Sequence, residues 1–249
     1  ICKTGLYYGI SVCDISTGEF YSSEIKGENN FEILLDEIAR FSPSEIIANS
    51  MMFECKDELD KIKERFNIYM NRFNDKFFSE DEGNLPLDYN IIENKKQVAS
   101  LKEKKLAVKS INALLEYLNE TQMTSLEHIN TITLYSISKY MLLDVTARRN
   151  LEITEKMRDK SKKGTLLWVL DKTSTSMGGR LLRRWLNDPL LEVKEIQERL
   201  DAVKELKENI MLRGDATETL KKVYDIERLA GKMTYGNANA RDMITLKNS

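Results

Sequence analysis

Cysteine and histidine are scarce in this chain of 249 residues, and their scarcity excludes several kinds of site. The three cysteines, Cys2, Cys13 and Cys55, are odd in number and form no CxxC pair, so neither a disulfide framework nor a zinc site is indicated. The only histidine, His128, has no cysteine or paired acid at ligand spacing, and we interpret it as a packed or surface imidazole. A reducing, cytoplasmic location fits this composition.

Long hydrophobic runs and an excess of positive charge are also missing. No stretch approaches the roughly 18 apolar residues of a membrane span, so we expect no membrane partner. The formal net charge is −2, whereas bulk nucleic-acid binding needs concentrated Lys and Arg. The chain opens at Ile1-Cys2-Lys3 without a signal peptide or an initiator Met. We interpret this start as a cut end and expect the first strand to be truncated, although a tag or a processing site would produce it too.

The sequence lacks the motifs of nucleotide and acyl-transfer chemistry. Gly231-Lys232-Met233 has neither the upstream glycine nor the following Ser or Thr of a phosphate-binding loop. There is no GxGxxG, and Gly178-Gly179-Arg180 is better explained as the entry of a helix. A Ser–His–Asp triad would have to use His128, and no GxSxG elbow exists for it. We therefore expect no catalytic residue, cofactor or metal in this chain.

The first part of the chain has the pattern of an α/β fold. Residues 6–13 are rich in aromatic and β-branched side chains, residues 14–18 supply turn chemistry, and residues 19–25 alternate as a partner strand. A helical pattern follows, with Asn30 as its expected N-cap. The apolar face of this helix consists of Phe31, Leu34, Leu35, Ile38 and Ala39.

Two more strands with a helix between them follow this hairpin and helix. Residues 44–49 are a short apolar strand, a helix runs through Leu59 and Ile62, and residues 66–70 are another strand. A hairpin followed by such repeats implies a mixed sheet with helices packed against it.

Beyond Pro86 the apolar spacing becomes helical, and Pro189 is the only later proline. The segment 73–87 marks the break. The apolar stripes include Leu101, Leu106, Ile111, Leu114, Leu115 and Leu118; Ile137, Met141, Leu142 and Val145; Val193, Ile196, Leu200, Val203 and Leu206; and Leu220, Val223, Ile226 and Leu229. Interruption at glycine and proline favours a packed helical core over one continuous coiled coil.

Two features could still carry a site. Asp14 ends a strand, as a magnesium ligand does in ribonuclease-H-like nucleases, but Asp is also favoured there as a turn residue. Residues 148–184 carry eleven Lys or Arg against four acids, a net +7. Five of these, Arg148, Arg149, Arg180, Arg183 and Arg184, are candidates for contact with a DNA backbone or with a neighbouring domain. We favour the turn for Asp14 and a solvated or domain-contacting face for the arginines.

Several strings in the second half, taken in order, resemble a known family. They are Asn150-Leu-Glu-Ile-Thr154, Leu166-Leu-Trp-Val-Leu-Asp-Lys-Thr173, Met177-Gly-Gly-Arg-Leu-Leu-Arg-Arg-Trp-Leu186, Arg199-Leu-Asp-Ala-Val203, Asp225-Ile-Glu-Arg-Leu-Ala230 and Ala240-Arg-Asp-Met243. They resemble the core domain of MutS-type DNA mismatch-repair proteins. Upstream, Asp14-Ile-Ser-Thr-Gly-Glu-Phe20 and Pro43-Ser-Glu-Ile-Ile47 are similar to the connector domain of that family.

The resemblance implies an α/β plus all-α chain of two domains. A ribonuclease-H-like mixed α/β connector without catalytic acids would span residues 1–122, and a helical core or lever domain residues 123–249. It also implies that the parent protein binds mismatched double-stranded DNA, uses ATP and magnesium elsewhere, forms a homodimer and docks a MutL-type partner through the connector. This segment would couple mismatch recognition to the distant ATPase.

Phe77 and Phe78 are adjacent aromatics in an otherwise polar break, and they are candidates for partner contact, with packing against the connector as the alternative. Two other functions stay open at this stage: a ribonuclease-H-like nuclease that uses Asp14, and a free-standing helical adaptor.

Overall fold

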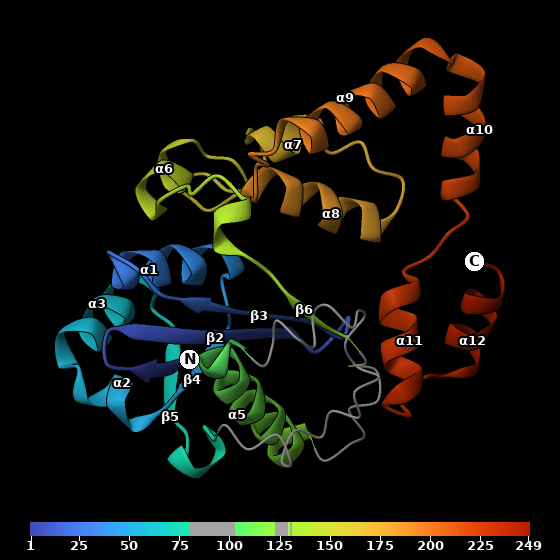
Figure 1. Ribbon diagram of the computed structural model, residues 1–249. Helices are drawn as coiled ribbons and strands as arrows, with labels where there is room; N and C mark the ends of the chain where they lie inside the picture. Colours follow the sequence, from blue (N-terminus) through green and yellow to red (C-terminus); the bar gives the residue numbers. More distant parts are fainter. Residues whose placement is uncertain (80–102, 123–128, 130) are drawn as a thin grey trace. The chain divides into compact units, whose positions relative to one another are not determined.

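The computed structural model describes residues 1–79, 103–122, 129 and 131–249 (Figure 1). They form two compact units, Ile1–Ile137 and Ser138–Ser249. The first unit combines strands with helices and the second consists almost entirely of helices, so the predicted α/β plus all-α class is confirmed.

A mixed sheet organises the first unit. Its larger part contains, in spatial order, β1 (Cys2–Thr4), β2 (Tyr7–Asp14), β3 (Glu19–Ile25) and β6 (Ile132–Leu134). The first three strands are antiparallel neighbours, and β6 is parallel to β3. The hairpin of β2 and β3 is the one that the alternating sequence predicts.

The strands β4 (Glu45–Ala48) and β5 (Tyr69–Arg72) are parallel to each other and form a second, two-stranded sheet, which contacts β1. The N-terminal ammonium of Ile1 donates to the carbonyl oxygen of Ile47 at 2.7 Å. The side chain of Asn49 accepts from the backbone N–H of Lys3 at 3.0 Å and donates to its carbonyl at 2.8 Å. Across the two sheets the order is therefore β6-β3-β2-β1 and then β4-β5, which agrees with the expected ribonuclease-H-like connector.

Helices cover both faces of this sheet (Figure 1). On one face lie α1 (Asn30–Phe41), α2 (Ser50–Glu54) and α3 (Lys56–Phe66), and on the other lies α5 (Lys105–Gln122). The core on the first face includes Tyr8, Ile10, Leu34, Leu35, Ile38, Ile46, Met52 and Ile62. The core under α5 includes Phe20, Val108, Ile111, Leu115, Leu118 and Ile132. Apolar side chains on both faces are what a strand covered on two sides requires.

Polar side chains make hydrogen bonds at the starts of α1 and α5. The expected N-cap of α1 is wrong by one residue: Asn29, with a φ of 55°, holds the cap position, and Asn30 starts the helix and donates to the carbonyl of Leu6. Near the start of α5, the carboxylate of Glu24 accepts from the backbone N–H of Leu106 at 2.6 Å and of Ala107 at 3.3 Å. A carboxylate at a helix N-terminus satisfies unpaired donors and complements the helix dipole.

The first unit continues to Ile137, past the boundary expected at residue 122. The reason is β6, which pairs with β3 and buries Ile132 under α5. The alternation of β-branched residues in Thr131-Ile-Thr-Leu134 is a strand signal that helical spacing on either side conceals.

The second unit consists of short helices joined by capped turns. They are α6 (Val145–Asn150), α7 (Leu166–Leu170), α8 (Ser176–Asn187), α9 (Val193–Glu208), α10 (Ile210–Leu220), α11 (Ile226–Thr234) and α12 (Ala240–Lys247), after the 3-10 turn η4 (Ile137–Lys139) at the junction. The side chains of Asp144, Thr165, Thr175, Asn209, Asp225 and Asn239 cap six of these helices. Side-chain caps stabilise helix ends where tertiary packing is thin. None of the described helices in either unit has the length and apolar character needed to cross a membrane.

Packing in the second unit differs from the compact core that the stripes predict. Val193 is 74% exposed and Leu200 55% exposed on α9, and Met211 is 81% exposed on α10. Among the side chains of the unit whose burial the structure describes, the buried apolar ones are Ile153, Leu167, Leu190 and Leu229. The helical spacing is therefore correct, but α9 and α10 meet too few other helices among the described residues to cover their apolar stripes.

At Gly9 on β2, the backbone of α5 lies close against the sheet. A Cβ at this position would stand 1.9 Å from the carbonyl oxygen of Leu106, which is backbone and cannot turn away. Replacing Gly9 with Ala should therefore destabilise the first unit by roughly 2–3 kcal/mol, the cost of overpacking a core. Urea unfolding followed by far-UV circular dichroism measures this loss.

Gly214→Ala is the matched control, because nothing lies within 4 Å of a Cβ there and Gly214 sits inside α10. We expect it to raise stability by up to about 1 kcal/mol through helix propensity. Both tryptophans, Trp168 and Trp185, lie in the second unit, so the fluorescence transition should not move in Gly9→Ala. An unchanged dichroism transition would show that α5 does not approach the sheet this closely.

Candidate functional site

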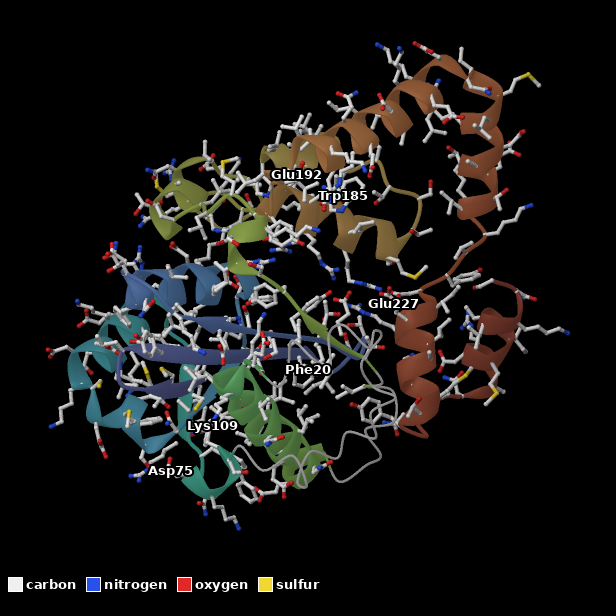
Figure 2. All side chains as sticks on the ribbon, viewed as in Figure 1. Phe20, Asp75, Lys109, Trp185, Glu192 and Glu227 are labelled. Carbon is white, nitrogen blue, oxygen red and sulfur yellow. The ribbon has the colours of Figure 1, made fainter. Side chains whose placement is uncertain are left out.

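A bridge between α8 and α11 joins two helices of the second unit through charged side chains. The guanidinium of Arg180 donates to both carboxylate oxygens of Asp225 at 2.7 Å, and also to Glu227 at 2.6 Å. Glu227 lies on α11 in Figure 2. Arg180 and Asp225 are 45 positions apart in the sequence, and α9 and α10 lie between them. The bridge therefore holds the first turns of α8 and the start of α11 together.

The two partners shift each other's pKa in the directions expected for a charge-assisted pair. Hydrogen bonding from Arg180 lowers the pKa of the Asp225 carboxyl below its ordinary value. Hydrogen bonding to Asp225 raises the pKa of Arg180, although partial burial opposes this. The planar fork of arginine meets a carboxylate with two parallel bonds, which fixes the distance and the orientation of the two helices.

The local sequence places Arg180 at this point. Thr175 caps α8 by accepting from the backbone N–H of Gly178 at 3.0 Å. Gly178 and Gly179 then form the first turn, where a Cβ would meet Thr173 or Thr175 within 3.0–3.3 Å. The prediction of a helix entry at Gly178-Gly179-Arg180 is confirmed. On α11, Asp225 is itself the N-cap and also accepts from the backbone N–H of Arg228.

The other arginines of the basic stretch lie in different settings. Arg148 donates from Nε to the carbonyl of Leu143 at 3.0 Å, and it is half-buried, as is Arg184. Arg149 and Arg183 are exposed. The five candidates are thus not one uniform basic face, because Arg180 is neutralised by two acids. Arg149 and Arg183 have the most exposed side chains for a surface contact.

Trp185 and Arg199 join α8 to α9. The guanidinium carbon of Arg199 stands 3.8 Å from the centre of the Trp185 ring, which Figure 2 labels on α8. At the junction, Lys139 pairs with Glu195 on α9 at 2.9 Å. These contacts use charged side chains and an aromatic face in place of a deep core.

Tyr135 fixes the path by which the chain leaves the first unit. Its hydroxyl donates to Glu37 on α1 at 2.6 Å, and its carbonyl accepts from the side chain of Ser23 at 2.8 Å. The guanidinium of Arg40 stands 4.9 Å from the centre of its ring, and the ring of Phe41 stands 5.9 Å away. Two residues later the first unit ends at Ile137.

The structure separates the two candidate phenylalanines. Phe78 is 8% exposed and packs with Cys2, Leu106 and Ala113, so its ring offers little surface to a partner. Phe77, in the 3-10 turn η1 (Asp75–Phe77), is half-buried. It stacks on Phe73 with ring centres 5.1 Å apart and lies under Lys76 at 4.3 Å.

Asp14 serves the turn between β2 and β3. One of its carboxylate oxygens accepts from the backbone N–H of Ser16 at 2.9 Å and from the hydroxyl of Ser16 at 2.7 Å. Its carbonyl accepts from Gly18 at 2.8 Å, which closes the turn. Over residues 1–79, 103–122, 129 and 131–249, no group of three or more His, Cys, Asp or Glu side chains could hold a metal ion.

Gly231-Lys232 lies inside α11, where Lys232 pairs with Asp242 at 3.2 Å, so it is part of a helix and not a phosphate-binding loop. His128 lies outside the described residues.

The comparison with protein families decides what the chain is related to. Residues 1–130 match the family model described as MutS domain II, and residues 146–249 match MutS domain III. This chain belongs to the MutS family. The division between the two models falls where the structure passes from its α/β unit to its helical unit.

Relatives named "DNA mismatch repair protein MutS" match along the whole chain. The protein of Ruminiclostridium cellulolyticum is 49% identical over 251 residues, and that of Acetivibrio thermocellus is 47% identical over 254 residues. Each match covers 100% of this chain but only 28% of the relative. The protein of Caldanaerobacter subterraneus is 46% identical over 240 residues, which cover 96% of this chain and 27% of the relative. The chain thus spans little more than a quarter of the length of these relatives.

Sequence reasoning found Arg180 but missed the residues that give it a role. Asp225 and Glu227 both lie in the string Asp225-Ile-Glu-Arg-Leu-Ala230. An acid at the start of a helix, followed by a second acid two positions further on, is the sequence signal that could have identified these two residues. Tyr135 was missed because β6 was missed.

The Arg180 bridge generates a stability prediction. Arg180→Lys keeps the charge but loses the paired geometry with Asp225, so we expect the second unit to lose about 1 kcal/mol, as for a partly exposed charge-assisted pair. Tryptophan fluorescence during urea unfolding follows this unit. Because the pKa of Asp225 is lowered by folding, the contribution is present above the ordinary pKa and is lost as the pH falls below about 4. The free energies of unfolding of the unsubstituted chain and of Arg180→Lys should therefore become equal in acid.

Arg183→Lys is the control, since Arg183 is exposed on the same helix. It should leave the fluorescence transition within a few tenths of a kcal/mol, as surface substitutions do. Equal losses in the two variants would show that the bridge contributes nothing of its own.

Proposed function

We propose that this chain is the coupling segment of a DNA mismatch-repair protein. In the parent, it would link recognition of mismatched double-stranded DNA to an ATPase elsewhere in that protein and dock a MutL-type partner through the connector. ATP and magnesium would then be needed by the parent and not by this segment. The parent would be a cytoplasmic homodimer, and this segment would be non-catalytic.

The single observation that carries the proposal is the Arg180 bridge. A segment that passes a signal between distant sites needs elements that move as bodies, together with contacts that hold or release them. The bridge holds the starts of α8 and α11 together with three hydrogen bonds. It lies at the surface, with Arg180 25% and Asp225 18% exposed, so it can break without opening a core.

The exit of the first unit supports the same role. The chain reaches Ile137 through β6 and Tyr135, and both are anchored to the sheet and to α1. A displacement of the chain at this point therefore acts on the connector as a body, since no flexible linker of Gly and Ser intervenes at residues 131–140.

The exposed faces of α9 and α10 support a place inside a larger protein. Their apolar side chains, including Val193, Leu200, Val203, Ile210 and Met211, are 55–81% exposed. Exposed apolar side chains gathered on neighbouring helices of a folded unit are typical of an interaction site. The MutS relatives provide nearly three quarters of their length outside this match, so these faces would pack against other parts of the parent.

The two alternative functions fit less well. A nuclease would need Asp14 as a metal ligand, but its carboxylate is engaged by Ser16 in the turn. A purely helical adaptor does not explain the α/β unit that occupies Ile1–Ile137.

The coupling role is tested in the full-length parent carrying Arg180→Lys. We expect basal ATP turnover to stay within about twofold, while its response to mismatched DNA falls by roughly fivefold or more, the lower range of allosteric coupling energies. ATP hydrolysis is measured with and without a mismatched duplex. Arg183→Lys should keep the full response. An unaltered response in Arg180→Lys would contradict the coupling role, and ATP hydrolysis by the isolated 249-residue chain would refute the assignment of a non-catalytic segment.

The docking role has a separate test. A photo-crosslinking residue at Lys76, which lies over Phe77, should capture the MutL-type partner in the presence of ATP and mismatched DNA. The same residue at Lys61 is the control, because Lys61 is also exposed but lies on α3, on the opposite face of the sheet. If the partner is captured at neither site, or equally at both, the proposal that it docks near Phe77 is refuted. This result does not bear on the coupling role.

A further inference from the structure

The loop that joins α6 to α7 lies at the surface of the second unit and has a closed shape (Figure 1). Leu167 donates to the carbonyl of Ile153 at 2.9 Å, so the two ends of the loop are hydrogen-bonded to each other. The side chains of Ile153, Thr165 and Leu167 are buried and anchor these ends. Within the loop, the backbone N–H of Lys156 donates to the carbonyl of Ser161 at 3.0 Å. A compact loop with joined ends holds its side chains in a constant arrangement.

Four exposed cationic side chains at this loop have no acid paired with them among the residues that the structure describes. They are Arg149, at the end of α6, and Arg158, Lys160 and Lys163 in the loop itself. Lys162 differs from them, because it pairs with Asp171. Cations that have no partner in their own chain keep their charge for a ligand, so the loop attracts anions.

The acids of the loop serve its backbone. One carboxylate oxygen of Asp159 accepts from the backbone N–H of Ser161 at 3.0 Å. One carboxylate oxygen of Glu152 accepts from the backbone N–H of Met157 at 2.9 Å. These two carboxylates shape the loop, and within the described part of the chain neither forms an ion pair with a lysine or an arginine.

Apolar side chains gather beside the cations. Glu152 follows Leu151 in the chain, its carbonyl accepts from the backbone N–H of Leu166 at 3.4 Å, and its carboxylate meets Met157. The backbones of Leu151, Met157 and Leu166 therefore meet at Glu152. Their side chains are 46–60% exposed. The loop thus combines positive charge with apolar contact area.

A nucleic-acid backbone does not match this combination. Binding of duplex DNA through phosphates commonly rests on about 6–10 cationic contacts, and the loop has four unpaired cations. Phosphates would also leave the apolar side chains uncovered, and the exposed acids Glu155 and Asp159 repel a continuous row of phosphates. The whole chain carries a formal net charge of −2, which disfavours a long polyanion more than a short acidic segment.

We propose that the loop between α6 and α7 docks an acidic segment of a partner protein, in which apolar residues stand between the carboxylates. Arg158, Lys160 and Lys163 pair with the carboxylates, which steers the encounter and selects the partner. Met157 and Leu166 provide the apolar contact. This docking site does not depend on the role in mismatch repair.

The test uses a fluorescein-labelled peptide, Asp-Asp-Leu-Asp-Asp-Phe-Asp-Asp-Leu, whose binding to the 249-residue chain is followed by fluorescence anisotropy at low salt. Replacing Arg158, Lys160 and Lys163 together with Ala should weaken binding by roughly tenfold, because each exposed ion pair contributes a factor of about 1.5–5. An unchanged Kd would overturn the proposal. Since all three side chains are exposed, the urea transition followed by tryptophan fluorescence should not move.

The matched control replaces Lys56, Lys61 and Lys63 on α3 with Ala, which removes the same charge from another exposed surface. It should change the Kd of the peptide by less than about twofold, because exposed charges beyond the Debye length are largely screened. Equal losses in the two triple variants would mean that the peptide responds only to net charge, and docking at the loop would be wrong.

A second peptide, with Ser in place of Leu and Phe, separates the apolar contact from the charge. Met157→Ser should weaken binding of the first peptide by roughly threefold and leave that of the second unchanged, since only the first can cover Met157. If the first peptide binds no more tightly than the second, the surface recognises charge alone and the proposed partner chemistry is wrong.

Two further measurements exclude other occupants. A fully paired DNA duplex should bind the chain equally well with and without the three loop substitutions. A loss of duplex binding as large as that of the peptide would assign the loop to nucleic acid and overturn the proposal. The full-length parent should bind the first peptide with the same dependence on Arg158, Lys160 and Lys163. If it does not bind, segments of the parent cover the loop, and docking of a separate partner is refuted.

Discussion

The approach of α5 to the sheet at Gly9 is the constraint on which the first unit depends. The backbone of Leu106 lies where any side chain at position 9 would project, and Glu24 holds the first amides of α5 at that point. With the helix this close, Ile111, Leu115 and Leu118 reach Phe20 and Ile132 and bury them. β6 is thereby placed beside β3, and Tyr135 is brought to α1. The path of the chain out of the connector thus follows from one close contact between a helix and a strand.

The second unit is held together by a different kind of interaction. Its core is thin, and the contacts that relate its helices are caps, the Arg199–Trp185 stack and the Arg180 bridge to Asp225 and Glu227. Directional polar contacts of this kind fix geometry but contribute little free energy when they are partly exposed. A unit built in this way can change the relation of its helices at small cost. Low-cost rearrangement of helices is a property of domains that change conformation, and rigid domains lack it.

The sequence predicted the elements better than it predicted their surroundings. The hairpin of β2 and β3, the helix α1 and the apolar stripe of α9 follow from spacing alone, because alternation and helical periodicity are local. β6 was missed because three residues leave a weak local signal, and its strand is stabilised by β3 from more than one hundred positions away. The exposure of α9 could not be predicted, since periodicity shows that a face is apolar and not what covers it.

The candidate site shows the same limit at the level of single residues. A run of positive charge identified Arg180, but charge alone does not distinguish a residue that meets DNA from one that meets acids of its own chain. Only the fold brings Asp225 to it, and the pair then changes from a surface feature to a link between two helices. Asp14 is the converse case, because turn chemistry within four residues was enough to place it.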